Sequence, residues 1–430
     1  MDSLRVRLTE SRSPGKVRRS AFFDQSEIWW EIEAPEPVLP EPLERHDVAA
    51  TALIFKAMES ARDLHIEGPV SRSLLAGLEE LVVSWVLWRP DLYAPIRLSA
   101  DIELDDAGST RHADTAIATC SGGVDSSFTI WRHFNARASR GSRKLGAALF
   151  VHGLDIPLAR HAQFEDAFTS AAETLRSIDL PLVKMRTNWR EQASRVWQMD
   201  FGSGLSSCLR QWQGTFDSAL IGSGEDYAHL VFPWGSNPIT FAMLSSPDFE
   251  ILWDGGGFGR TAKLEAISNW PEALNNLRVC WQNTSESANC GRCEKCVRTK
   301  LNFRTLGLSL PPSLGGEPTL AQIAALRASN AVKVTQLQDI VEHCRRGGTL
   351  PGWARAVQLS IAWNSALNAA KQTKKVLFPR RRPAKQGTPI ATGIAVAEPP
   401  LAPVEEPGAR LSGEVEHLAL GAGRPTADHP

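Results

Sequence analysis

A short polar stretch between an apolar run and an amphipathic segment contains the first residues that could do chemistry. Residues 116–120 are apolar enough for a buried strand, and Ser121-Gly122-Gly123 interrupts them. The following segment runs through Trp131 and Phe134 with helical spacing. The pattern therefore predicts a strand, a tight glycine turn and a helix, with the turn at the N-terminus of the helix.

Such a turn favours the binding of an anion. Adjacent glycines widen the choice of backbone conformation and remove side chains that would keep a ligand from the backbone. The free N–H groups and the hydroxyls of Ser121, Ser126 and Ser127 then converge at a helix N-terminus. Asp125 fits there if a divalent metal ion bridges it to a phosphate. The simpler alternative is an ordinary turn in which Asp125 and Ser126 cap the helix.

The whole stretch resembles the pyrophosphate-binding loop of the PP-loop, or N-type, ATP pyrophosphatase family. It is not a Walker loop, because no Gly-Lys-Ser/Thr follows. The resemblance implies that ATP and Mg²⁺ are cofactors, and that Asp125 and Ser121 act in catalysis. It also implies that the phosphates are held by Ser121, Gly122, Gly123, Val124, Asp125, Ser126 and Ser127.

The elements around the loop indicate an α/β fold. From Ile117 the chain alternates strands and helices, which predicts a doubly wound parallel sheet. Together with the loop, this pattern resembles an adenine nucleotide alpha hydrolase-like PP-loop domain. The further strands are expected at 145–152, 182–186 and 218–222, and the helices at 157–178 and around 205–212.

Candidate binding residues follow these strands, because ligands of such sheets bind beyond the carboxyl ends. By the resemblance, His152 and Asp155 line an adenosine pocket, although loop capping explains Asp155 as well. Gly222 ends the fourth strand and precedes the carboxylate pair Glu225-Asp226, a candidate for a magnesium ion or a substrate amine, or a solvated turn.

A glycine-dense stretch at 254–259 is expected to be a mobile loop that carries Arg260 toward phosphate. Arg260 and Lys263 are candidate catalytic residues that neutralise charge as pyrophosphate leaves. The alternative for these two side chains is a solvated helix start.

Four of the seven cysteines are close together in the sequence. Cys280, Cys290, Cys293 and Cys296 have the short spacing that lets thiolates surround one zinc ion. Four thiolates leave no open coordination position, so the predicted Zn²⁺ is structural. An iron–sulfur cluster is the alternative, since Cys-x₂-Cys-x₂-Cys also suits one.

The loop and the cysteines in this order are similar to the 7-cyano-7-deazaguanine synthases, over residues 114–305. Cys280-Trp281, Cys290-Gly291, Cys293, Cys296 and, one residue closer than in the family, Arg298 carry the likeness. It implies adenylation of a heterocyclic carboxylate, displacement of AMP by ammonia, and queuosine biosynthesis. The family's Tyr-Pro-Asp-Cys-Arg stretch is missing, and Phe232-Pro233-Trp234 is the nearest equivalent.

Composition divides the chain into four regions. Residues 1–110 are expected to form an accessory α+β domain, with a strand at 26–32, helices at 49–64 and 71–87, and a strand at 96–104. Residues 111–310 are the PP-loop domain with its zinc-binding segment, and 311–375 contain three helical patterns. Residues 376–430 are rich in Pro, Ala, Gly and Glu and are expected to be a disordered tail.

The numbers of charged residues limit the classes of binding partner that we expect. With 47 basic and 48 acidic residues, no overall field favours nucleic acid or a membrane. No apolar signal segment opens the sequence, which predicts a cytoplasmic protein. We expect a ligase or amidotransferase that uses a small carboxylate and ammonia, which must be free or delivered by another protein. The alternatives are a PP-loop tRNA-modifying enzyme, or one with a protein acceptor, and a non-catalytic ATP-binding scaffold.

Overall fold

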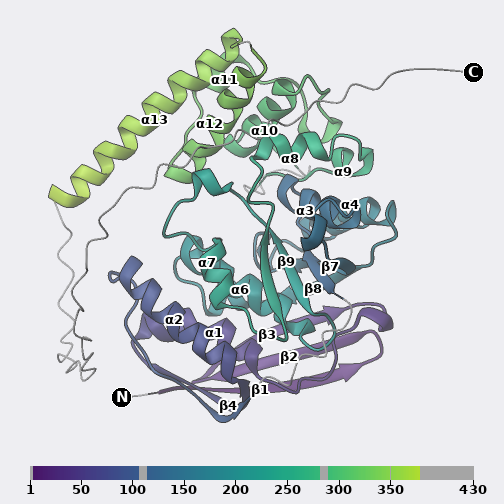
Figure 1. Ribbon diagram of the computed structural model, residues 1–430, viewed down its shortest axis with the longest axis vertical. Helices are drawn as coiled ribbons and strands as arrows, with labels where there is room; N and C mark the ends of the chain where they lie inside the picture. The colour runs from purple at the N-terminus through teal and green to yellow at the C-terminus, as the bar shows by residue number, and fades with distance from the viewer. Residues whose placement is uncertain (1–2, 106–113, 281–288, 349, 378–430) are drawn as a thin grey trace, which may run out of the picture. The chain divides into compact units, whose positions relative to one another are not determined.

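The computed structural model describes residues 3–105, 114–280, 289–348 and 350–377. Its centre is one ten-stranded sheet with the strand order β10-β9-β6-β7-β8-β3-β2-β1-β4-β5. The strands are β1 (Ser3–Ser13), β2 (Lys16–Phe23), β3 (Ser26–Glu33), β4 (Asp63–Ser71), β5 (Leu98–Leu104), β6 (Thr115–Thr119), β7 (Lys144–His152), β8 (Leu182–Thr187), β9 (Ser218–Gly222) and β10 (Glu250–Asp254). Figure 1 shows the purple strands of the N-terminal region beside those that follow in sequence.

Helices connect and cover these strands. They are α1 (Asp47–Ser60), α2 (Arg72–Trp88), α3 (Val124–Phe134), α4 (His161–Arg176), α5 (Trp189–Gln192), α6 (Trp197–Leu209), α7 (Pro238–Met243), α8 (Arg260–Ala266), α9 (Pro271–Asn275), α10 (Glu294–Thr305), α11 (Leu320–Ala324), α12 (Ala331–Arg346) and α13 (Gly352–Leu377). Short 3₁₀ turns are η1 (Glu36–Val38), η2 (Ser139–Gly141), η3 (Arg210–Trp212), η4 (Tyr227–His229) and η5 (Pro312–Leu314).

The sheet is mostly parallel, which confirms the predicted α/β class. Strands β6, β7, β8, β9 and β10 pair with one another in parallel. The chain moves from β6 to β7 and β8 on one side, then returns to place β9 and β10 on the other. The strand order therefore reverses between β6 and β9, which is the position where open α/β sheets bind ligands.

Several boundaries differ from those expected. The helix predicted at 205–212 is α6, which begins earlier, at Trp197, and the helix predicted from Pro157 begins at His161 because a turn precedes it. Leu64 is in β4 and not in the helix expected at 49–64. Strands β1, β2, β4 and β10 were not expected.

The N-terminal region continues the same sheet. Strand β3 pairs with β8 in antiparallel register, with Trp30 opposite Thr187. One cluster of buried side chains includes Leu53 of α1, Ile117 of β6 and Leu209 of α6. Residues 1–378 accordingly form one compact unit.

Successive side chains of β6 point to opposite faces of the sheet, and both faces are covered by helices. Ile117 belongs to the cluster shared with α1 and α6, while its neighbours Ala116 and Ala118 pack with Phe164 of α4. Strand β6 is thus buried on both faces, as is usual for a parallel strand with helices on either side of the sheet.

Three helices follow residue 311, near the three predicted patterns, and α12 packs on both α8 and α10. Residues 376 and 377 of the predicted disordered tail belong to α13, and its other residues, 378–430, lie outside the described part of the chain. Among the described residues, no helix is both long and apolar enough to span a bilayer.

Candidate functional site

The serine–glycine loop is the predicted turn between β6 and α3. Gly122 has a φ of 71°, which favours glycine, and Gly123 is the N-cap of α3. The backbone N–H of Ser121 donates to Ser126 Oγ at 3.2 Å, and Ser126 Oγ donates to the Gly123 carbonyl at 3.2 Å. Hydrogen bonds between its own residues therefore hold the loop. The first amides of α3 have no acceptor within the helix, so they are free to bind an anion.

Gly222 lets the end of β9 approach this loop. A Cβ at Gly222 would lie 2.7 Å from the carbonyl oxygen of Asp125 and 3.1 Å from the amide nitrogen of Ser126. Real Cβ atoms do not come so close to backbone, so any other side chain would push α3 away from β9. The close approach forms the reversal point of the sheet.

Asp125 is held between two cations. Arg260 Nη2 lies 2.5 Å from one carboxylate oxygen of Asp125, and Lys263 Nζ lies 3.7 Å from the other. Lys263 also donates to the carbonyl of Ser223 at 2.5 Å and to its hydroxyl at 2.7 Å. Burial lowers the pKa of both Arg260 and Lys263, and the Asp125 charge opposes that effect. These cations account for Asp125 without a metal ion.

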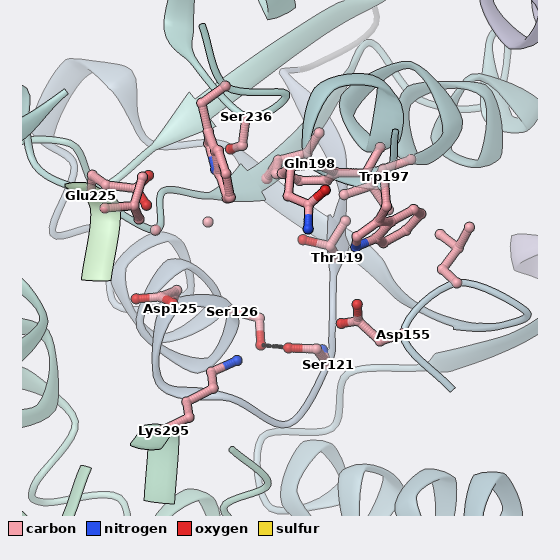
Figure 2. Close-up of a pocket in the computed structure, with 18 of the residues that line it drawn as sticks. Thr119, Ser121, Asp125, Ser126, Asp155, Trp197, Gln198, Glu225, Ser236 and Lys295 are labelled. Carbon is pink, nitrogen blue, oxygen red and sulfur yellow. Dashed lines mark hydrogen bonds between the residues drawn. The ribbon is translucent and has the colours of Figure 1, made fainter. Parts of the chain in front are cut away.

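A cavity of about 620 Å³ opens beside the loop, at the carboxyl ends of β6 and β9. Figure 2 shows Ser121, Ser126 and Asp125 on its wall. Five cationic and four anionic side chains line it, namely Arg260, Arg278, Lys295, Arg298 and Lys333 against Asp125, Asp155, Glu225 and Glu294. The excess of positive charge and the helix N-terminus both favour an anionic ligand.

Helix α10 supplies two of the cations. Lys295 extends toward Ser121 and Ser126 in Figure 2. Arg298 is only 3% exposed; its Nε donates to Glu294 at 2.7 Å, and its Nη1 has no hydrogen-bond partner in the described part of the chain. A buried guanidinium with a free N–H group is costly unless a ligand completes its hydrogen bonds.

Another part of the cavity is aromatic. Trp197 and Phe201 project from α6 with ring centroids 5.5 Å apart, and Trp234 lies 6.2 Å from Phe201. All three line the cavity. Figure 2 shows Trp197 and Gln198 beside Thr119 and Asp155. Flat rings of this kind stack on heterocycles, so the cavity combines a cationic part with an aromatic one.

The structure brings seven of the predicted site residues to the cavity. These are Ser121, Asp125, Ser126, Asp155, Gly222, Glu225 and Arg260. Of the remaining loop residues, Val124 packs in a core cluster with Phe128, Ser127 is buried, and Gly122 and Gly123 shape the turn. Lys263 is not part of the cavity lining; it pairs with Asp125, which is.

His152 is located differently from the others. Its ring is fully buried, stacks on Phe164 at 4.3 Å and pairs through Nε2 with the Pro157 carbonyl at 2.9 Å. Burial lowers its pKa, so the neutral ring is favoured. His152 does not belong to the cavity lining, and it fixes the turn between β7 and α4.

Arg260 also differs from the expectation of a mobile loop. It is the first residue of α8, is buried, and is held by Asp125. Three of the four preceding glycines, Gly255, Gly256 and Gly259, pack closely; a Cβ at Gly256 would lie 2.3 Å from the Trp253 ring. The glycine-dense stretch is a packed turn.

The four predicted cysteines form a cluster that could bind one metal ion. All four Sγ atoms lie within 4.8 Å of one another, and the pairs Cys280–Cys293 and Cys290–Cys296 are each 3.9 Å apart. A tetrahedral zinc site with Zn–S bonds of ~2.3 Å places its sulfurs about 3.8 Å apart. An iron–sulfur cluster has several irons between its thiolates and needs wider spacing. The donor set therefore fits a single ion.

Sequence reasoning missed much of the cavity wall. The sequence pointed to Arg298 only through the family likeness and did not point to Lys295, although their i, i+3 spacing after Cys293 puts them on one helix face. Lys333 and Gln336 of α12 and Arg278 had no sequence signal. Arg278 is placed by its backbone N–H, which donates to the Gly122 carbonyl at 2.8 Å.

Comparisons of the chain with protein-family models, with curated proteins and with solved structures found no match.

Proposed function

We propose that this protein binds ATP in the cavity and uses it in an AMP-forming reaction that activates a carboxylate or carbonyl of a second substrate. The reaction is that of the PP-loop family, and within it of the 7-cyano-7-deazaguanine synthases, which the loop and the cysteines resemble. One observation carries the proposal: the serine–glycine loop opens, at the reversal point of the sheet, into a cavity of about 620 Å³ whose charged lining has an excess of cations.

The phosphates of ATP would lie at the N-terminus of α3. Its free amides and the hydroxyls of Ser121 and Ser126 offer hydrogen bonds, and Lys295 offers charge from the other side. Arg298 has an unused N–H group for a phosphate or a substrate carboxylate. Such fixed positive groups stabilise the charge that develops as pyrophosphate leaves.

The adenine or a flat substrate ring would stack at the aromatic part. Trp197, Phe201 and Trp234 line it. Asp155, also in the lining, provides an acceptor for a sugar hydroxyl or a ring N–H. This arrangement supports a heterocyclic second substrate, as the resemblance implies.

Mg²⁺ is expected to enter with the nucleotide. Asp125, the residue that suggested it, is already paired with Arg260 and Lys263, so its carboxylate is no independent sign of a metal site. When bound, Mg²⁺ would neutralise phosphate charge and polarise the phosphoryl oxygens.

A structural Zn²⁺ would occupy the cysteine cluster. The cluster packs with Val124 and Phe128 of α3, and Cys293 is the N-cap of α10. The metal would thereby hold both the phosphate loop and the helix that carries Lys295 and Arg298.

The test is to incubate the protein with Mg²⁺, ammonium chloride, 7-carboxy-7-deazaguanine and ATP labelled in the α-phosphate. We expect labelled AMP and an equal amount of pyrophosphate. Lys295→Met should weaken ATP binding about tenfold or more, whereas Lys16→Met, at a lysine 62% exposed on β2, should not.

Other products would contradict the proposal. ADP and phosphate alone would exclude an adenylating mechanism. ATP binding without AMP over a panel of carboxylates would favour a scaffold. Salt-dependent binding of tRNA, with AMP formed only when tRNA is present, would favour a tRNA-modifying enzyme.

A further inference from the structure

Glu225 is a buried carboxylate that the binding of ATP does not use. It follows β9, lines the cavity and is 7% exposed. Figure 2 shows it on the far side of the cavity from Asp155. Within the described part of the chain its carboxylate accepts no hydrogen bond. A buried carboxylate with free acceptor positions is costly, and the cost is offset where a ligand donates to it.

The backbone around Glu225 is held from three elements. Lys263 of α8 donates to the Ser223 carbonyl, and Gln336 of α12 donates to the Gly224 carbonyl at 3.2 Å. On the other side, the Tyr227 amide donates to the Gly256 carbonyl at 2.7 Å. The backbone is thus fixed before and after Glu225, so the side chain projects into the cavity from a held segment.

The surroundings make Glu225 a usable base at neutral pH. Burial raises its pKa to about 7, and the negative charge of Asp125 acts in the same direction. Arg260, Lys263 and Arg298 oppose these effects but do not cancel them. A general base works best when its pKa is close to the working pH.

The other carboxylates of the cavity wall have partners. Asp125 pairs with Arg260, and Glu294 accepts from Arg298. Asp155 is exposed and interacts with Arg278. Among the described residues of the lining, Glu225 is therefore the carboxylate that is buried and has neither a salt bridge nor a hydrogen bond to a neighbouring side chain.

We propose that Glu225 is the proton acceptor for an amine nucleophile, ammonia or a primary amine, in the second half of the reaction. The inference rests on the proposed function. The nitrogen lone pair forms the N–C bond to the activated carbonyl, and the C–O bond to AMP breaks with its electron pair remaining on the phosphate oxygen. The proton that the nitrogen must lose moves to the Glu225 carboxylate.

The two half-reactions can be measured separately. Pyrophosphate exchange into ATP, with 7-carboxy-7-deazaguanine as the probe, reports adenylation, in which no amine takes part. Glu225→Gln is expected to leave this exchange within about twofold of wild type, whereas amide formation from ammonium chloride should fall about 10²–10⁴-fold. Glu265→Gln, at a carboxylate 63% exposed on α8, is the matched control and should change neither rate.

Hydroxylamine distinguishes a proton acceptor from a structural residue. Its nitrogen is weakly basic, so the proton passes to water without help after attack. Glu225→Gln should therefore form the hydroxamate at a rate close to that of wild type. For wild type, the rate of amide formation per unprotonated ammonia should fall below about pH 7, and this dependence should vanish in the variant.

The outcomes separate the two proposals. Absence of pyrophosphate exchange in the wild-type protein would overturn the proposed function. Normal exchange together with normal amide formation in Glu225→Gln would overturn the role of Glu225 alone. Loss of exchange in this variant, or no recovery with hydroxylamine, would also contradict a proton-accepting role.

Discussion

At the scale of single residues, the charges of the site form one connected set. Asp125 of α3 pairs with Arg260 and Lys263 of α8. Lys263 also donates a hydrogen bond to the carbonyl of Ser223, two residues before Glu225. The sequence suggested a metal ion at Asp125 because a carboxylate beside a bound phosphate needs a cation between the two negative charges. The two cations are more than a hundred residues away in the sequence, and only the fold brings them close.

Asp125→Asn should destabilise the protein, because it leaves Arg260 and Lys263 buried without a counter-charge. We expect a loss of about 3 kcal/mol in the free energy of unfolding, measured in urea. Adding Arg260→Gln should recover part of the loss, since one unpaired charge then disappears. A single variant as stable as wild type would show that the ion pairs contribute little.

Glu225 should make stability depend on pH. Its pKa of about 7 in the folded protein lies above the 4.5 of an exposed glutamate, so the folded state binds the proton more tightly. Its contribution is fully present below about pH 4.5 and is lost as the pH rises through 7. Glu225→Gln should match wild type at pH 4.5 and exceed it at pH 8, by on the order of 1–3 kcal/mol in thermal unfolding.

The exposed Glu265→Gln should show no such difference between the two pH values. A Glu225→Gln protein that is less stable than wild type at pH 8 would contradict the effect of burial.

At the scale of elements, the contact between β9 and α3 determines the geometry of the loop. Gly222→Ala should separate them, because its Cβ meets the Asp125 carbonyl at 2.7 Å. We expect a lower melting temperature and a loss of ATP affinity of tenfold or more in equilibrium binding. Gly224→Ala is the control: this glycine lines the same cavity, and a Cβ there has no atom within 4 Å. Equal affinities in the two variants would contradict this role of Gly222.

The cysteine cluster supports α10. We expect one zinc and no iron per chain by elemental analysis. Removal of the metal with a chelator should lower the melting temperature and the ATP affinity together, because Cys293 and Cys296 position Lys295 and Arg298. Cys344→Ser, at a buried cysteine outside the cluster, should retain the metal. Iron in place of zinc, or unchanged ATP binding after chelation, would contradict this prediction.

The sequence predicted those elements that have a recognisable pattern over a few consecutive residues. The loop at 121–127, strands β7, β8 and β9 and the cysteine quartet all have short-range signatures, and the structure contains each of them. Strand β1 does show the period of a strand, with Arg5 and Arg7 alternating with buried apolar residues, but this signal was missed. In β2 the consecutive Arg18 and Arg19 interrupt the alternation. The part of the cavity wall that α12 contributes could not be predicted. The spacing of apolar residues predicts a helix, but it does not show which other elements the helix packs against.

At the scale of the whole molecule, the continuous sheet joins the N-terminal region to the site. Arg19 of β2 is fully buried and donates to the Gln211 carbonyl of η3 at 2.6 Å, and the Trp189 indole donates to the Ala52 carbonyl of α1 at 2.8 Å. Helix α1 also packs along α6, which carries Trp197 and Phe201. The N-terminal region therefore supports the aromatic part of the cavity from behind.

This continuity predicts that the N-terminal region and the site unfold together. Leu53 of α1 is fully buried, so Leu53→Ala should cost about 3 kcal/mol. All seven cysteines lie at or after Cys120, so thiol labelling in denaturant reports only on the later part of the chain. The labelling midpoint of Cys120 and Cys208 should shift by as much as the circular-dichroism midpoint. Leu359→Ala, at a leucine 72% exposed on α13, should shift neither. If the cysteines of the Leu53→Ala protein stay protected at the wild-type midpoint, the two regions unfold separately and the sheet does not couple them.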